Sequence, residues 1–463
     1  MTSPLMSDTS GNKKAQPDLI NKSLSAYYNV ALQKLCLIAK SASRGMPSVL
    51  YFEPASGCNL ACPACPTGIE TGGRPAQLTD FDRFREAVDL LGPKLFLLYM
   101  YNWGEPLLNK RVSDYISYAT EADIYTSISS NLSIKLSDAR MESLLEAGLG
   151  ELKVGLDGWT QPVYQKYRRN GEVELVKDNL RRFAALKQNR PELNTNIYVQ
   201  FHAFQHNLHE VQTVKQFCRE LGIGFGVSGV VYTAEEEGIY SATPDHDAGL
   251  RNWKQLKKQA NYEKGCSWLT HALVIEPSLD VAPCCGVSDA KDNFAKLNQD
   301  SFSSFCKAPY SHSAWVAAKS FLDQLPANGF YDILVNNSRV KGMGLVRGGA
   351  AREGFICSRC PLGLQVGSWS TLESVIAEHL SWQIKAMMKT RPNFVSEHKQ
   401  TIKKKFAAIE VLGLINKLTA PEAQGVLDSL GDRLEGHGSQ DALISALGGE
   451  VIAVLRSSGR LDN

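Results

Sequence analysis

Apolar residues along the first half of the chain follow two alternating patterns. Short, mostly apolar runs indicate β-strands near residues 49–53, 95–100, 125–129, 152–156, 197–202 and 225–230. Between these runs, helical spacing of apolar residues indicates helices near 79–92, 109–122, 138–147, 173–188 and 208–221. Strands that alternate with helices are typical of parallel β/α units. The pattern predicts an α/β fold, a partial (β/α)6 TIM-like barrel, over residues 48–233.

The pattern changes on both sides of this predicted barrel. Residues 1–47 combine a polar start, expected to be disordered, with one helix predicted from an apolar stripe that includes Leu24 and Leu35. Residues 234–264 are polar and charged, as in a linker or an insertion. Residues 265–370 hold a later group of cysteines, for which we expect a small separate domain. Residues 371–463 have the pattern of a helical C-terminal extension.

Composition restricts the class of protein. The 463 residues exceed one ordinary domain, and 43% hydrophobic with 21% charged residues is typical of a globular protein. The net charge of +2 gives no reason to expect a nucleic acid as partner. The first residues lack a secretion signal, and no apolar run approaches the ~18 residues of a membrane span. With 11 cysteines and no signal, we expect a cytoplasmic protein that uses cysteine for metal or redox chemistry.

Three closely spaced cysteines carry the strongest chemical signal. Cys58, Cys62 and Cys65 have the spacing C-x3-C-x2-C and follow the first predicted strand directly. Three thiolates on one loop can hold three irons of a cubane cluster and leave the fourth iron open to a small molecule. A structural zinc knuckle is the alternative, but it needs a fourth ligand nearby, and the next histidine is His202. A disulfide is disfavoured by the tight spacing.

A second motif follows the second predicted strand. It reads Trp103-Gly104-Glu105-Pro106, with Trp where a "GGEP" motif has its first glycine. Together with the three cysteines, it resembles the radical S-adenosylmethionine (SAM) enzymes. The resemblance implies a 4Fe-4S cluster whose open iron binds SAM. It also implies that one electron cleaves SAM to a 5′-deoxyadenosyl radical, and that the backbone of the second motif accepts hydrogen bonds from the SAM amino group.

The resemblance extends to the ends of later strands. It places Ser129, Ser130 and Asn131 near the ribose and methionyl parts of SAM. The run Val154-Gly155-Leu156-Asp157-Gly158 precedes Arg168, the candidate clamp on the SAM carboxylate. Each segment also has a purely structural explanation that needs no cofactor: a turn, a surface arginine or a structural histidine. The expected cofactor-binding residues are Trp103, Gly104, Glu105, Pro106, Ser129, Ser130, Asn131, Asp157, Arg168, Gln200 and His202.

The later cysteines predict a second metal site. Their arrangement resembles the twitch form of the SPASM extension, in which four cysteines hold one auxiliary 4Fe-4S cluster; zinc on the same thiolates is the alternative. Cys285 competes with Cys284 as second ligand, and Cys285 and Cys306 are candidate hydrogen donors to a substrate radical. Cys36 and Cys218 have the pattern of core residues. The expected ligands of this cluster are Cys266, Cys284, Cys357 and Cys360.

The sequence therefore predicts a radical SAM enzyme, an oxidoreductase or epimerase. The twitch-like layout favours oxidation or epimerisation of a sugar-type or other small-molecule substrate. Modification of a ribosomal peptide is the alternative, disfavoured because residues 1–47 are too short for a winged-helix leader-binding domain. An alternative of another class is a non-catalytic, metal-dependent scaffold. The expected partners are the substrate and an external one-electron donor such as flavodoxin or ferredoxin.

Overall fold

The computed structural model describes most of the barrel and several later segments of the chain. The described residues are 22–39, 46–70, 73–190, 193, 195–229, 238–239, 268–287, 289–316, 376–377, 380–381, 384, 388, 391–430 and 440–461. The segment expected to be disordered, residues 1–17, lies outside them. Almost all of the predicted linker 234–264 lies outside them as well.

Six parallel strands form the centre of the molecule. They run β6-β5-β4-β3-β2-β1 across the sheet, and each pairs with its neighbour in parallel. All six match the predicted strands to within a few residues. Their bounds are β1 Val49–Phe52, β2 Leu97–Tyr99, β3 Tyr125–Ser130, β4 Glu151–Gly155, β5 Asn196–Ala203 and β6 Gly224–Gly229. The mixed α/β fold with a parallel-dominated sheet is confirmed, and the order is consistent with a partial barrel.

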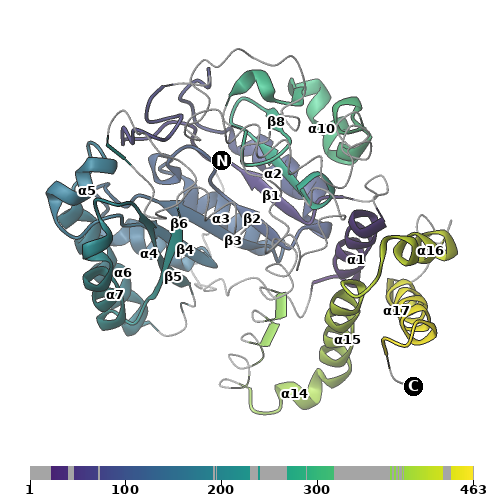
Figure 1. Cartoon of the computed structure of the whole chain (residues 1–463). Helices are drawn as coiled ribbons and strands as arrows, with labels where there is room; N and C mark the ends of the chain where they lie inside the picture. The colour runs from purple at the N-terminus through teal and green to yellow at the C-terminus, as the bar shows by residue number, and fades with distance from the viewer. Residues whose placement is uncertain are drawn as a thin grey trace, which may run out of the picture.

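Amphipathic helices cover one face of this sheet (Figure 1). Each turns an apolar stripe inward: Phe84, Val88 and Leu91 of α2 are buried in the same core cluster as Leu98 and Ile128 of the strands. The short helix α5 was not predicted, because seven residues are too few to show a helical period. The helices are α2 Phe81–Leu91, α3 Val112–Glu121, α4 Asp138–Glu146, α5 Gln161–Tyr167, α6 Val173–Asn189 and α7 Val211–Glu220.

Three further strands extend the same sheet beyond β1. β7 (Ala272–Ile275) pairs in parallel with β1, and β8 (Asp280–Ala282) and β9 (Ala295–Lys296) follow in antiparallel order. β7 and β8 thus form a hairpin directly before Cys284. We expected this part of the chain to form a separate domain. Its strands instead continue the barrel sheet, because β1 pairs with β2 along one edge and with β7 along the other. Helix α10 (Gln299–Lys307) then packs against α2.

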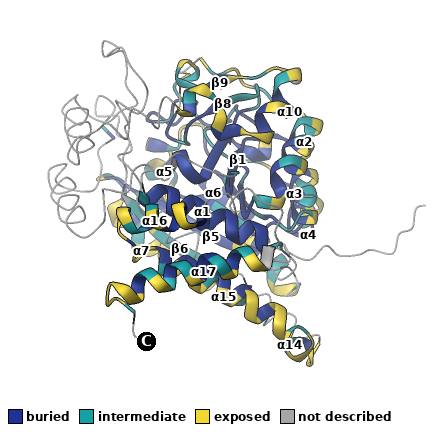
Figure 2. Ribbon diagram, turned by 90° about the vertical axis from the view of Figure 1, so that its right-hand side faces the viewer, coloured by how far each residue is buried: buried dark blue, intermediate teal, exposed yellow. Residues whose placement is uncertain are grey.

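The N-terminal helix α1 (Leu24–Ala39) is enclosed by helices from the other end of the chain. In Figure 1 it lies beside α15 (Lys399–Ile415) and α16 (Ala420–Leu430), and it also contacts α17 (Gln440–Ser457). Figure 2 shows α1 as buried almost throughout, polar side chains included. These find partners: Lys34 Nζ donates to the Leu412 carbonyl at 2.8 Å, and Asn29 Nδ2 to that of Met46 at 2.8 Å. After residue 371, all regular elements that the structure describes are helices, as expected for this extension.

Within the described ranges, no helix is both long and apolar enough to cross a membrane.

Candidate functional site

The three-cysteine loop follows β1 and lies at the carboxyl ends of the parallel strands. Gly57 O accepts from Glu105 N at 2.8 Å, and Ala61 N donates to Arg169 O at 3.1 Å. These bonds attach the loop to the segments that follow β2 and α5. Chemistry in β/α barrels is carried by this edge, so the predicted cysteine site and the later motifs do share one rim.

The three thiols belong to one small apolar cluster. Cys62 is buried among Leu60, Ala64, Tyr167 and Phe204, and Cys58 and Cys65 pack against the same group. Burial raises the pKa of Cys58 to about 11 and that of Cys62 to about 12, and Arg168 opposes the rise in both. Burial likewise raises the pKa of Cys65, where backbone hydrogen bonds act in the opposite direction. Iron ligation requires the thiolate, so a bound metal must supply the charge that favours it.

The sulfurs are not arranged around a single ion. Among the described residues, no group of three or more His, Cys, Asp or Glu side chains is positioned to hold one metal ion. A mononuclear site needs its ligands to converge, whereas a cubane takes each thiolate on a different iron. A cluster on these three thiols stays a prediction, with zinc as the alternative.

Glu53 holds the Trp103–Pro106 segment in place. Its Oε1 accepts from the backbone N–H groups of Trp103 at 2.7 Å and Gly104 at 2.6 Å. Its Oε2 pairs with Arg74 at 2.5 Å, and Arg74 also pairs with Glu276 at 3.0 Å, beyond the end of β7. Both carboxylates are buried. This ionic chain ties the rim of β1 to the rims of β2 and β7.

Gly104 lies so close to the cysteine loop that no side chain fits. A Cβ built there would be 1.9 Å from the Ala55 carbonyl oxygen and 2.8 Å from the Ser56 carbonyl carbon. Both atoms are backbone, so they cannot move aside cheaply. The Gly in this motif is thus explained by packing of one loop on the other, which forms a cradle of exposed backbone at the rim.

Glu105, Ser130 and Asn131 join the rims of β2 and β3. The buried Glu105 carboxylate accepts from Leu107 N at 3.0 Å and Asn131 N at 2.8 Å. Asn131 Nδ2 lies 3.7 Å from Cys58 Sγ and donates to Asn59 Oδ1 at 2.9 Å. These expected cofactor residues therefore position the cysteine loop; Ser129 instead stands on the opposite face of β3 and is partly exposed.

Asp157, Arg168 and His202 form a buried charged network. Asp157 is fully buried; its Oδ2 pairs with Arg168 Nε at 2.5 Å, and its Oδ1 lies 3.0 Å from His202 Nδ1. Burial alone would raise the pKa of Asp157, but Arg168 and His202 hold that pKa well below its usual range. Asn207 adds a bond from Nδ2 to the Asp157 carbonyl at 2.9 Å. Three of the expected residues are thereby brought together from β4, α5 and β5.

Arg168 faces the thiols and occupies space that Gly155 leaves. A Cβ at position 155 would be 2.3 Å from Arg168 Nη2, so the lack of a side chain at Gly155 lets the guanidinium lie over β4. Asp157 binds the Nε edge of this guanidinium, and Arg168 opposes the raised pKa of all three cysteines. An arginine so placed suits a planar, bidentate carboxylate.

An aromatic group adjoins Ala64, the position before the third cysteine. Tyr167 and Phe204 have ring centroids 4.4 Å apart, and His206 stacks on Phe204 at 5.4 Å. Both ring nitrogens of His206 are buried without a hydrogen-bond partner among the described residues. Unpaired buried polar atoms are costly, and a ligand with both a donor and an acceptor would satisfy them. Together with the backbone cradle and the three thiols, this fits an iron–sulfur cluster with SAM.

The remaining expected residues are dispersed. Gln200 lies on β5 and donates to Ser228 Oγ at 3.1 Å. Cys306 is fully buried on α10 in the core cluster shared with α2, which argues against the expected role as hydrogen donor.

Cys284 and Cys285 are partly buried and pack with tyrosines of β1 and β2. Cys36 and Cys218 are buried, as predicted. Cys266, Cys357 and Cys360 lie outside the described residues.

Sequence reasoning missed Glu53, Arg74 and the network role of Asn207. For Glu53 a signal existed: an acidic residue that ends a buried strand just before the cysteine loop is unusual, since isolated buried carboxylates are costly. For Arg74 there was none, because its two partners are distant in sequence.

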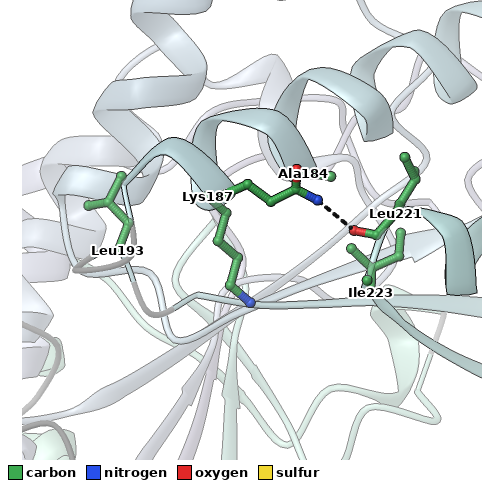
Figure 3. Close-up of a pocket in the computed structure, with 7 residues that line it drawn as sticks. Ala184, Lys187, Leu193, Leu221 and Ile223 are labelled. Atoms are coloured by element: carbon green, nitrogen blue, oxygen red, sulfur yellow. Dashed lines mark hydrogen bonds between the residues drawn. The ribbon is translucent and has the colours of Figure 1, made fainter.

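A hollow of about 340 Å³ on the outside of the barrel is a different feature (Figure 3). It is lined by Ala184, Lys187, Gln188, Leu193 and the turn 221–223, and Gln188 Nε2 donates to Leu221 O at 3.4 Å. These residues belong to α6 and to the segment that enters β6, at the amino ends of the strands. The hollow therefore lies at the edge opposite to the cysteine loop.

Gly104→Ala should destabilise the protein by about 1–3 kcal/mol, the usual cost of forcing extra volume into a packed site. The reason is the overlap with the Ala55 backbone. Urea unfolding measures the difference. Gly413→Ala in α15, where no atom lies within 4 Å of the added Cβ, is the control and should not destabilise. Equal stability of Gly104→Ala and the wild type would contradict the close approach of the two loops.

Comparison with known proteins agrees with this site. Residues 52–216 match the family model described as "Radical SAM superfamily". The chain is 28% identical over 116 residues to the PqqA peptide cyclase of Rhodopseudomonas palustris, covering 25% of this chain and 30% of that protein. It is 29% identical over 138 residues to the probable GTP 3′,8-cyclase of Methanocaldococcus jannaschii, covering 30% and 44%. The chain thus spans less than half the length of either relative.

Among solved structures, Streptococcus suis SuiB bound to S-adenosylmethionine is similar with a TM-score of 0.45 and 15% identity, covering 60% of this chain and 68% of that chain. The matched family segment runs from the end of β1 into α7 and includes all three cysteines of the loop and the Asp157–Arg168–His202 network. Over residues 52–216 the chain therefore matches the radical SAM superfamily.

Proposed function

We propose that this protein is a radical SAM enzyme that modifies a peptide. The observation that carries the proposal is the placement of Cys58, Cys62 and Cys65 in one cluster on the rim, facing Arg168. When bound, the cluster and SAM supply one-electron reductive cleavage of SAM and, through it, removal of a hydrogen atom from a substrate carbon. An external donor such as flavodoxin or ferredoxin provides the electron.

The chain's own residues bind and orient. The three thiolates hold iron, Arg168 binds the carboxylate of SAM, and Asp157 keeps the Arg168 guanidinium aimed by holding its Nε edge. Glu53 fixes the backbone of Trp103–Pro106, whose carbonyl oxygens accept from the SAM amino group. The apolar surroundings of Cys62, with Leu60, Tyr167 and Phe204, exclude water from the cluster.

The substrate class follows from the relatives. Three matched curated proteins carry the name PqqA peptide cyclase. The name of a fourth, probable GTP 3′,8-cyclase, fits a small-molecule substrate. Because three of these four names refer to a peptide, a peptide is the better proposal than the sugar-type substrate expected from the twitch-like layout. Because the matches cover less than half of each relative, this support concerns the radical SAM domain and extends to the whole chain only as a proposal.

An auxiliary 4Fe-4S cluster is part of the same proposal. Its ligands would be Cys266, Cys284, Cys357 and Cys360, with Cys285 as the alternative to Cys284. The partly buried position of Cys284 and Cys285, beside the barrel sheet, supports a second metal site that adjoins the barrel.

The test is anaerobic turnover. The reconstituted, reduced protein should convert SAM to 5′-deoxyadenosine, and a short peptide encoded beside its gene should speed this conversion and gain or lose mass. Liquid chromatography with mass spectrometry follows both products. Free sugars and aminocyclitols serve as the competing substrates; if only these are modified, the peptide proposal is wrong and the sugar-type alternative holds. If iron-loaded protein forms no 5′-deoxyadenosine, the proposal that it is a radical SAM enzyme is wrong.

A further inference from the structure

The inner face of the sheet is polar along β3, β4 and β5, where a closed barrel would be packed with aliphatic side chains. Strands alternate, and Ile128, Leu152, Val154 and Val199 point to the buried helix-covered side. Their neighbours therefore occupy the other face, and along β4 and β5 these alternate positions are partly exposed. A packed barrel interior is dominated by branched aliphatic residues. The polar residues on the inner face of β3, β4 and β5 include Ser127, Ser129, Glu151, Lys153, Tyr198 and Gln200.

Lys153 is the basic residue at the centre of this inner face. Its strand partners are Ser129 on β3 and Tyr198 on β5. Its Nζ lies 3.5 Å from Tyr101 Oη and 5.8 Å from the centre of the Tyr101 ring. The side chain is 24% exposed, so the ammonium is only partly buried.

Glu151 does not account for this lysine. Lys153 Nζ is 3.9 Å from Glu151 Oε2, at the outer limit of an ion pair, and both side chains are partly exposed. Such pairs contribute little to stability. The same Oε2 accepts from Ser127 Oγ at 2.8 Å. A structural ion pair is thus a weak reason for a lysine inside the barrel.

Lys153 lies directly beneath the proposed SAM site. Gly155, on which the Arg168 guanidinium rests, is two residues further along the same face of β4. One pleat of two residues spans about 7 Å. A substrate group that reaches past SAM into the barrel would therefore meet the ammonium of Lys153 and the hydroxyl of Tyr101.

We propose that Lys153, with Tyr101 beside it, forms a subsite that binds a carboxylate of the substrate. An ammonium and a phenol hydroxyl are both donors, and a carboxylate is the acceptor that a peptide provides, either on an acidic side chain or at its C-terminus. This inference rests on the proposed function, because it takes the inner face of the barrel as the substrate chamber.

Three small probes test the subsite on the iron-loaded protein with SAM present. N-acetylglutamate α-amide carries a side-chain carboxylate, its isomer N-acetylglutamine carries a terminal one, and N-acetylglutamine amide carries none. Isothermal titration calorimetry should show one carboxylate probe binding about tenfold or more tightly than the neutral amide, the range of a charge-assisted hydrogen bond. Lys153→Met should abolish this preference, and Lys153→Arg should retain part of it.

The controls separate this inference from the proposed function. Lys187→Met, in the outer hollow of Figure 3, should keep the wild-type preference. Iron content of Lys153→Met should equal that of the wild type, and substrate-free SAM cleavage of the Lys187→Met control should equal that of the wild type. Equal binding of all three probes, or a carboxylate preference that survives in Lys153→Met, overturns the subsite while leaving the proposed function intact. Loss of SAM cleavage in the wild type would instead contradict the proposed function, whatever the probes do.

Discussion

Replacing Cys58, Cys62 and Cys65 together by alanine is expected to lower the iron content of the reconstituted protein from about eight irons per chain to about four, as for the loss of one of two four-iron clusters. SAM cleavage should disappear with these irons. The three thiols share one cluster of side chains on the rim, so no other described cysteine is placed to replace them. Anaerobic reconstitution followed by colorimetric iron and sulfide assays measures the change.

Two matched variants complete this test. Cys357→Ala with Cys360→Ala should remove the other four irons, by the same count, and leave SAM cleavage in place. Cys218→Ala, a buried cysteine of α7, should change neither quantity. If the wild type holds about four irons and the triple variant almost none, the barrel cluster is supported and the auxiliary cluster is contradicted. Unchanged iron in the triple variant, or zinc in place of iron, would reject the barrel cluster.

Asp157→Asn is expected to destabilise the protein by about 3–5 kcal/mol, the cost of leaving one partner of a buried ion pair uncompensated. Asp157 is fully buried and Arg168 is 15% exposed, and their atoms lie 2.5 Å apart. The amide keeps the shape but removes the charge, and its NH₂ group cannot accept from the guanidinium. Urea unfolding at neutral pH measures the loss, and SAM binding should weaken because Arg168 is no longer held.

Asp138→Asn is the matched control for this substitution. Asp138 also pairs with an arginine, Arg182, at 2.5 Å, but it is 75% exposed. Exposed pairs contribute about 0–1 kcal/mol, so a comparable loss in both variants would show that burial does not decide the effect.

The lowered pKa of Asp157 means that its stabilisation is fully present above the ordinary carboxyl pKa and is lost only as pH falls through the lowered value. The part of the difference that comes from the ionisation of Asp157 should therefore be fully present at pH 5 and above.

Local spacing was enough to locate the cysteine site. Cys58, Cys62 and Cys65 are close in sequence, so a short loop brings them together whatever the rest of the chain does. The order of strands and helices was also predictable, since each follows from a local period of apolar residues. Because parallel strands end at the same edge, the sequence also indicated that the cysteine loop and the Gly104 segment share a rim.

Roles that depend on burial were harder to assign. Glu105 and Asn131 were expected at SAM, and this role stays a prediction. The structure adds that Glu105 accepts from Asn131 N and that Asn131 Nδ2 donates to Asn59 Oδ1, which the sequence did not show. Arg168 was expected near SAM, but the sequence did not show that Asp157 holds it. A side chain's partner is decided by which atoms surround it after packing, and sequence spacing does not contain that information.

The sequence by itself determined the parallel α/β architecture and the closeness of the three cysteines of the loop, and it carried the match of residues 52–216 to the radical SAM family model. It could do so because periodicity and short-range spacing act within a few residues. Only the tertiary structure decided that β7 completes the barrel sheet, that α1 is enclosed by helices more than 350 residues away in the chain, and that Glu53 holds the Gly104 backbone. It also decided that Lys153 faces the barrel interior beneath Arg168. These features join segments distant in sequence, so they depend on the packing of the whole chain.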